Sequence, residues 1–176
     1  MELVGDKERL AGILVSQDAP TLAQVLLELA EDFPAVCARL ERLKVRDDPA
    51  ELSAQFSLRL ESWRTDDRFV RYEGAAAFGK DLVVWVTQVQ REVLPCFPGE
   101  AMALLAAFLE LDRVVFERVD DDGGYVGGAF DLACQLWLNA AADAGLSGAE
   151  IASRTSAMLS ADNYGARSEL RRTVTR

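Results

Sequence analysis

The sequence of 176 residues contains no histidine. Histidine is the commonest general base near neutral pH, the partner of serine and cysteine nucleophiles, and a frequent zinc ligand. Its absence excludes Ser–His and Cys–His catalysis and every zinc site that needs an imidazole. The many carboxylates show no spacing that singles out one acid and one base. We therefore predict no catalytic residue, and we favour a protein that is not an enzyme.

Cysteine is also scarce, with Cys37, Cys96 and Cys134 far apart and no CxxC pair. This pattern excludes a zinc knuckle and a redox dithiol. The apolar neighbours of the three residues predict buried, reduced thiols, which are typical of a cytoplasmic protein. The acidic opening MELVGDKERL lacks the basic and apolar regions of a signal peptide. Both observations predict a cytoplasmic location.

Long apolar runs are missing, since no stretch approaches the 18 residues that a membrane helix requires. Positive charge is in deficit, because 29 acidic and 19 basic residues give a net charge of −10. Such a surface repels phosphates, so neither a membrane nor nucleic acid is expected as a partner. Only the C-terminus is basic, with Arg167, Arg171, Arg172 and Arg176, and we interpret it as a solvated helix end. Nucleic-acid contact there is a weaker hypothesis.

Apolar residues recur at helical spacing along almost the whole chain, and no alternating strand pattern competes with them. Asp18, Asp32 and Asp48 each precede a proline and then an apolar stretch. This arrangement predicts three helices with an aspartate cap and a proline in the first turn.

Longer helices are predicted from Tyr72 onward, with a break between residues 95 and 98 and a central apolar helix over residues 99–118. A helix over AFDLACQLWLNAAADA ends at Gly145, and Ser147 with Glu150 forms a capping box for the next helix. A last short helix is expected to begin near Asp162 or Asn163.

These signals predict an all-α fold, an array of about eight or nine mostly antiparallel helices, with an irregular solenoid among the arrangements that the pattern allows. A single helical domain is expected over residues 1–176. Within it, short helices in 1–66 and longer core helices in 67–176 mark a weak subdivision. Three tryptophans at helical spacing, Trp63, Trp85 and Trp137, are predicted core anchors.

The segment VDDDGGYVGG, residues 119–128, resembles a calcium loop at first sight. Asp120, Asp122 and Asp131 occupy positions 1, 3 and 12 of an EF-hand loop, and these three are the only metal-ligand candidates in the chain. Position 5 is Gly124 and position 6 is Tyr125, so one ligand and the turn glycine are misplaced. We therefore predict no metal site.

The same segment contains GYVG, which matches the GxxG of a KH loop, but three adjacent aspartates would repel the phosphates that such a loop holds. We interpret it as a structural connection between two helices, built from Asp120, Asp121, Gly124, Val126 and Gly127. The glycines allow positive φ, one aspartate caps backbone N–H groups, and Tyr125 and Val126 pack back onto the core.

Two further stretches are candidate binding sites. GAAAFGKD, Gly74 to Asp81, differs from a P-loop by an aspartate in place of the hydroxyl residue, and no buried strand precedes it, so no nucleotide cofactor is predicted. The polar line Asp131, Gln135 and Asn139 could join Glu110 around a small-molecule pocket. The solvated face of an amphipathic helix is the favoured interpretation of that line.

The segment VDDDGGYVG resembles the VDDSDGSVG-like segment of an uncharacterised bacterial all-helical family, a domain of unknown function. The matching residues are Val119, Asp120, Asp121, Gly124, Val126 and Gly127. Similar stretches are LLELAEDFPAVCARL, Tyr72 with Ala75, Phe78 and Leu82, and ADNYG from Ala161 to Gly165. Gly123 and Gly128 depart from the pattern, because the family usually has acids or small polar residues there.

Relatives in that family include C-terminal regions of proteins with a SWIM-type zinc finger. The resemblance implies a helical fold and no established activity. The chain has no histidine and no cysteine pair, so the zinc and nucleic-acid functions of that finger do not carry over.

Together these features favour a noncatalytic helical scaffold that binds another protein or itself, without a cofactor. The alternative is a helical domain that binds a small molecule or a metal, with enzymatic activity left open. An acidic surface predicts a basic partner and weaker binding at high salt.

Overall fold

The computed structural model describes residues 2–171, with side chains from residue 6 onward. These residues form nine α-helices, one π-helical segment and one 3₁₀ turn, with no β-strand among them. The all-α fold and the predicted number of helices are confirmed. None of the helices in this range is long and apolar enough to span a membrane.

The chain divides into two compact units, residues 1–46 and residues 47–176. The division lies upstream of the subdivision at 66/67 that the sequence suggests, because the helix that ends at Thr65 belongs to the second unit. Its buried residues explain this assignment: Leu52, Phe56, Leu60 and Trp63 recur every three or four positions along that helix, as residues of a helix packed on a core do.

The first unit consists of α1 (Glu2–Val15), α2 (Ala19–Asp32) and α3 (Pro34–Lys44). The predicted cap at Asp18 is confirmed, because its carboxylate accepts a 2.7 Å hydrogen bond from Thr21 N. The cap predicted at Asp32 is wrong. Only Phe33 separates α2 from α3. Its N–H donates the last hydrogen bond of α2, to Leu29 O, and its carbonyl accepts the first hydrogen bonds of α3. Asp32 is therefore the last residue of α2.

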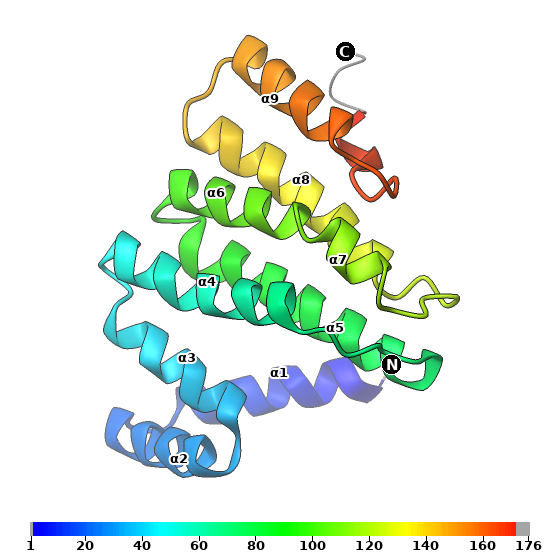
Figure 1. The fold of residues 1–176 in the computed structure, drawn as a ribbon. Helices are drawn as coiled ribbons and strands as arrows, with labels where there is room; N and C mark the ends of the chain where they lie inside the picture. Colours follow the sequence, from blue (N-terminus) through cyan, green and yellow to red (C-terminus); the bar gives the residue numbers. More distant parts are fainter. Residues whose placement is uncertain (1, 172–176) are drawn as a thin grey trace. The chain divides into compact units, whose positions relative to one another are not determined.

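The second unit contains the other helices, of which the long ones run alternately in opposite directions, while α7 continues in the direction of α6 (Figure 1). They are α4 (Pro49–Thr65), α5 (Tyr72–Gln88), the π-helical segment Val89–Val93, α6 (Pro98–Leu109), α7 (Asp112–Phe116), α8 (Gly127–Asp143), α9 (Gly148–Ser160) and the 3₁₀ turn Ser168–Leu170. The short loops between long helices account for the antiparallel order, as the sequence predicts.

Aromatic side chains form the centre of the second unit. The ring of Phe108 on α6 stacks on Trp85 of α5 at 5.4 Å and contacts Phe130 of α8 at 4.9 Å. Trp85 Nε1 donates a 3.3 Å hydrogen bond to Phe56 O, which satisfies its one buried polar atom. Trp63 and Trp137 are buried as well, so the prediction of three tryptophan anchors is confirmed.

Two helix ends near the C-terminal part of the unit follow the sequence prediction. Gly145 has φ 81°, and Gly145 N and Leu146 N bond to Ala142 O and Ala141 O, which is a Schellman motif. Ser147 and Glu150 form the predicted capping box of α9. Asp48 caps α4 through Ala50 N and Glu51 N, also as predicted.

The single helix predicted over residues 99–118 is broken, because α6 ends at Leu109 and α7 begins at Asp112. The Asp112 carboxylate accepts a 2.8 Å bond from Arg113 N, and Leu111 N bonds to Phe108 O. The aspartate side chain thus replaces a carbonyl of the helical ladder, as short polar side chains often do.

The last short helix predicted near residue 162 is also wrong. The Asp162 carboxylate accepts bonds from Ala166 N and Arg167 N, at 3.0 and 3.2 Å, and so closes a loop instead of starting a helix. The 3₁₀ turn Ser168–Leu170 follows this loop, and its Leu170 is fully buried.

Two of the three cysteines are exposed, contrary to prediction. Cys37 lies on the outer side of α3, and Cys96 lies in the turn that precedes α6, so an apolar neighbour in the sequence did not mean burial. Cys134 is buried on α8. Burial, followed by the charge of Asp131, raises the pKa of its thiol to about 12.

This difference predicts the pattern of thiol modification. At neutral pH a thiol-specific reagent should modify Cys37 and Cys96 quickly, while Cys134 reacts only after denaturation, because the thiolate is the reactive form. Mass spectrometry of the native protein at increasing times of exposure measures this. A chain with Cys37→Ser and Cys96→Ser should remain unmodified until it unfolds, and rapid native labelling of that variant would contradict the burial of Cys134.

Candidate functional site

The segment 119–128 connects α7 to α8 and is fixed at its first residue. Val70 and Val119 form an isolated parallel β-bridge, in which Val70 N donates to Arg118 O at 2.8 Å and Asp120 N donates to Val70 O at 2.9 Å. The Arg118 side chain also donates to Asp66 O. The start of the connection is therefore joined to the residues that lead into α5.

The turn itself is closed by one aspartate. The two oxygens of Asp121 accept hydrogen bonds from Tyr125 N at 2.7 Å and Val126 N at 3.0 Å, and Gly124 has φ 68°. Val126 is fully buried, whereas Tyr125 is half exposed. Gly127 is the first residue of α8. The segment thus has the geometry of a connection between two helices, and the Asp121 carboxylate is bonded to the backbone of the same segment.

The three metal-ligand candidates of this region have different surroundings. Asp120 and Asp131 are half-buried, and Asp122 is exposed. Among residues 6–171, whose side chains are described, there is no group of three His, Cys, Asp or Glu residues that could hold a metal ion. Asp120, Asp122 and Asp131 therefore do not come together as a ligand set.

Gly79, in the stretch GAAAFGKD that is similar to a P-loop, has a packing role. The stretch lies inside α5, and a Cβ atom at Gly79 would lie 2.5 Å from Tyr125 O. The backbone of the connection 119–128 therefore approaches α5 at a point that only glycine permits. The stretch 74–81 and the connection 119–128 are therefore in contact at this point.

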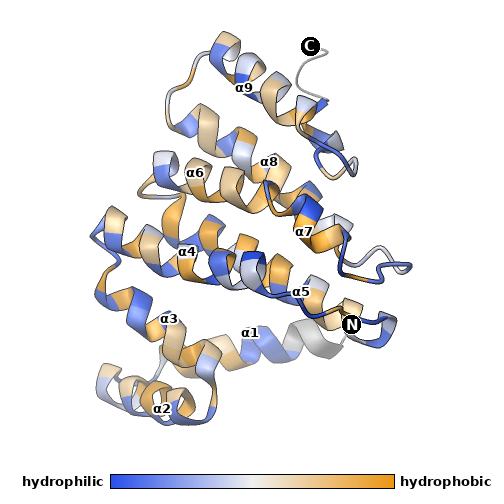
Figure 2. Ribbon diagram, viewed as in Figure 1, coloured by the Kyte–Doolittle hydropathy of each residue, from blue (hydrophilic) through white to orange (hydrophobic). Residues whose placement is uncertain are grey.

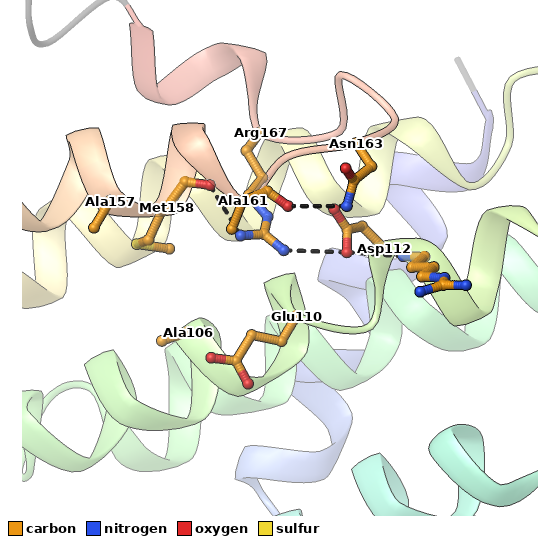
Figure 3. Close-up of a pocket in the computed structure, with 9 residues that line it drawn as sticks. Ala106, Glu110, Asp112, Ala157, Met158, Ala161, Asn163 and Arg167 are labelled. Atoms are coloured by element: carbon orange, nitrogen blue, oxygen red, sulfur yellow. Dashed lines mark hydrogen bonds and ion pairs between the residues drawn. The ribbon is translucent and has the colours of Figure 1, made fainter.

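A hollow of about 500 Å³ lies between the α6–α7 junction and α9 with the segment that follows it (Figure 3). This volume is within the range of small-molecule pockets. Its walls come from four parts of the second unit and consist of Ala106, Glu110, Asp112, Arg113, Ala157, Met158, Ala161, Asn163 and Arg167.

A buried ion pair forms one wall of the hollow. Arg167 Nη2 lies 3.1 Å from Asp112 Oδ1, and the two side chains are only 5% and 3% exposed. Arg167 Nη1 donates to Met158 O at 2.9 Å, which fixes the guanidinium against the end of α9. Asp112 Oδ2 and Arg167 Nε are buried and have no hydrogen-bond partner. Buried polar atoms are usually hydrogen-bonded, in many cases to ordered water.

Next to this wall, Tyr164 holds the segment after α9 against α7. Its ring stacks on Phe116 at 5.8 Å, and its hydroxyl donates a 2.9 Å bond to Glu117. Arg113 Nε lies 3.0 Å from the same Glu117 carboxylate. The bond from Tyr164, and then the one from Arg113, lowers the pKa of Glu117 below its ordinary value.

The small-molecule pocket considered from the sequence forms with other partners. Glu110 lines the hollow, but Asp131, Gln135 and Asn139 are not part of it. Gln135 and Asn139 are exposed on α8, which is the solvated face that the sequence favours. Sequence reasoning missed Asp112, Asn163 and Arg167. Besides Glu110, the resemblance of ADNYG to a family segment pointed to this region, since Asn163 lies inside it.

A family model describes most of this chain. The model of a family of unknown function, DUF6880, matches residues 11–176. The chain belongs to the DUF6880 family. The match includes the connection 119–128 and every residue that lines the hollow. Comparisons with curated proteins and with solved structures gave no match.

The approach of Tyr125 to α5 predicts a steric penalty at Gly79. Gly79→Ala should lower the free energy of unfolding, because overpacking typically costs about 1–3 kcal/mol. Chemical denaturation of the purified protein measures the change.

The matched control is Gly128→Ala on α8, where a Cβ would meet nothing within 4 Å. Its stability should be unchanged or slightly raised, because alanine favours a helix over glycine by up to about 1 kcal/mol. Equal stability of the two variants would refute the close approach at Gly79.

Proposed function

We propose that this chain is a noncatalytic helical scaffold that binds another protein through the helices of its first unit. The single observation that supports the proposal is that α2 buries none of its residues, although leucine and valine dominate its middle. A soluble helix of this composition normally packs its apolar side against a core.

The apolar residues of α2 form a continuous surface. Leu22, Val25, Leu26 and Leu29 follow the i, i+3, i+4, i+7 spacing of one helix side. Val25, Leu26, Leu27 and Leu29 are all among the exposed large hydrophobic residues. Figure 2 shows hydrophobic residues along α2 and α3. Exposed apolar area of this kind commonly marks a protein-binding surface.

The charges around this surface indicate what it binds. From Asp18 to Asp32 there is no lysine or arginine, and Glu28, Glu31 and Asp32 lie in the last turns of α2. Carboxylates at a helix C-terminus face the negative end of the helix dipole, which is unfavourable. Positive charge on a partner would relieve this repulsion. We therefore infer an amphipathic helix with an apolar side flanked by lysine or arginine as the bound segment.

A pair of matched peptides tests this. One is an amphipathic helix with a leucine stripe flanked by lysines, and the other has the same stripe flanked by glutamates. Fluorescence anisotropy should show binding of the basic peptide only, with an affinity that falls as salt rises. Leu26→Ser should weaken binding about tenfold, because one leucine side chain in an interface contributes about 1.5–3 kcal/mol.

Leu58→Ser is the control, because Leu58 on α4 is 66% exposed and lies in the other unit. It should leave peptide binding unchanged. Equal effects of the two substitutions, or equal binding of the two peptides, would overturn the proposal. Sedimentation of the free protein tests whether a second copy of the chain covers this surface instead. A dimer that Leu26→Ser dissociates would show that it does.

The cellular location and the source of the protein are part of the same proposal. The three cysteines are free, and two of them are exposed, which supports a cytoplasmic location. The resemblance of the stretches at residues 119–127 and 161–165 also supports a bacterial source and relatives that carry a SWIM-type zinc finger.

A second candidate function is small-molecule binding by the second unit. It is favoured by the buried oxygen Asp112 Oδ2, which has no partner and belongs to a wall of the hollow. The two functions use different units of the chain, so a test of one does not decide the other.

A further inference from the structure

Three aromatic side chains of the second unit are exposed on two segments, residues 66–73 and 119–128. Their exposed fractions are 62% for Phe69, 52% for Tyr72 and 45% for Tyr125. The parallel bridge between Val70 and Val119 places the two segments side by side, at the end of the unit where α5 begins (Figure 1). Aromatic side chains are enriched in protein interfaces, so exposed rings on neighbouring segments are typical of a binding surface. These three side chains are called the aromatic surface below.

Tyr125 is held in place from two sides, although nearly half of it is exposed. A Cβ atom at Gly123 would clash with the tyrosine ring, and a Cβ atom at Gly79 of α5 would lie 3.0 Å from Tyr125 Cβ. Glycine at both positions therefore leaves room for this one side chain. A side chain that is already fixed loses little conformational entropy when a partner covers it.

The charge of the two segments is predominantly negative. Together they contain six carboxylates and two arginines. One of the arginines, Arg68, is paired with Asp66 at 2.8 Å. Two cations lie next to the segments: Arg118, which is 3.6 Å from the same Asp66 carboxylate, and Lys80 on α5. The carboxylates remain in excess when these two cations are included, so the surface attracts a positively charged partner.

Two of the carboxylates are available to such a partner. The side chains of Asp120 and Asp122 have no hydrogen bond or ion pair among the described residues, and Asp122 is exposed. Asp121 differs from them, because both of its oxygens are bonded to backbone N–H groups of the turn. The turn that Asp121 closes thus presents two unpaired carboxylates and the ring of Tyr125 within six residues of the chain.

We propose that the aromatic surface binds an arginine-rich segment of a partner protein. A guanidinium ion stacks on the face of an aromatic ring and also donates paired hydrogen bonds to a carboxylate. The exposed rings and the carboxylates of Asp120 and Asp122 supply both kinds of contact. A lysine ammonium group is compact and more strongly hydrated, so it fits this combination less well. The surface lies in the second unit, so the inference goes beyond the proposed function of the first.

Two other occupants fit less well. Single-stranded nucleic acid stacks its bases on aromatic side chains, but the excess of carboxylates repels its phosphates. A purely apolar segment would cover the rings and bring no charge to Asp120 and Asp122. Charge complementarity therefore favours the cationic segment.

Three matched peptides test the inference. They have one length and alternate glycine with arginine, lysine or glutamate, and isothermal titration calorimetry compares them at constant ionic strength. The arginine peptide should bind with a defined stoichiometry, the lysine peptide about tenfold more weakly and the glutamate peptide not at all. None of them has a leucine stripe, so Leu26→Ser on α2 should leave the binding of the arginine peptide unchanged.

Asp122→Asn should weaken binding of the arginine peptide about tenfold, because it removes one charge and keeps the shape. The matched control is Asp143→Asn, which removes the same charge from an exposed aspartate at the far end of α8, about 25 Å along the helix from Gly127. This control should bind as the unmodified protein does. Equal weakening in both variants would show only general attraction to an acidic protein, and would overturn the proposal.

The role of the rings is tested by Phe69→Leu and Tyr125→Leu, which keep an apolar side chain and remove the aromatic face. Each should weaken binding of the arginine peptide about two- to fivefold. Chemical denaturation checks that both variants are folded, and Phe69→Leu decides the matter if Tyr125→Leu disturbs the turn. Unchanged binding in both variants, with equal affinity for the arginine and lysine peptides, would show that the rings do not bind. If no peptide binds, the inference fails and the proposed function of α2 is unaffected.

Discussion

The ion pair between Asp112 and Arg167 determines the local structure of the second unit around the hollow. A buried charge is tolerated only when it is paired, because its transfer from water costs several kcal/mol. Asp112 sits at the break between α6 and α7, and Arg167 lies in the segment after α9. The pair therefore joins two parts of the chain that share no other ion pair among the described residues, and the hollow lies beside that junction.

The chemistry of the two candidate surfaces follows from what each one leaves unsatisfied. On α2 the unsatisfied feature is apolar area, with acids in the last turns of the helix and no lysine or arginine between Asp18 and Asp32. In the hollow it is one buried carboxylate oxygen, Asp112 Oδ2.

Much of the fold could be predicted because its signals are local. The Asp18 and Asp48 caps, the Ser147 capping box and the glycine at 145 each depend on residues within one or two turns. The errors at Asp112 and Asp32 arose from local hydrogen bonds that the apolar spacing does not reveal. The Asp112 carboxylate interrupts the apolar helix by accepting a bond from Arg113 N. Phe33 ends one helix and begins the next, which left no place for a cap at Asp32.

The candidate site was harder to predict than the fold. Glu110 was considered as a pocket residue, but with partners on α8 that face solvent. Arg167 was interpreted as part of a solvated basic end, and its burial depends on a loop that Asp162 closes. Gly79 lies in a stretch that differs from a P-loop by one residue. Its packing role follows only from the close approach of Tyr125 to α5. No spacing in the sequence encodes contacts of this kind.

A double-mutant cycle on the ion pair is the most direct test of this account. Asp112→Leu and Arg167→Met should each lower the free energy of unfolding by about 3–5 kcal/mol, because each leaves a buried charge alone. The double variant should lose far less than the sum of the two. Additive losses, or single losses below about 1 kcal/mol as for a surface pair, would show that the two side chains do not hold α7 and the segment after α9 together.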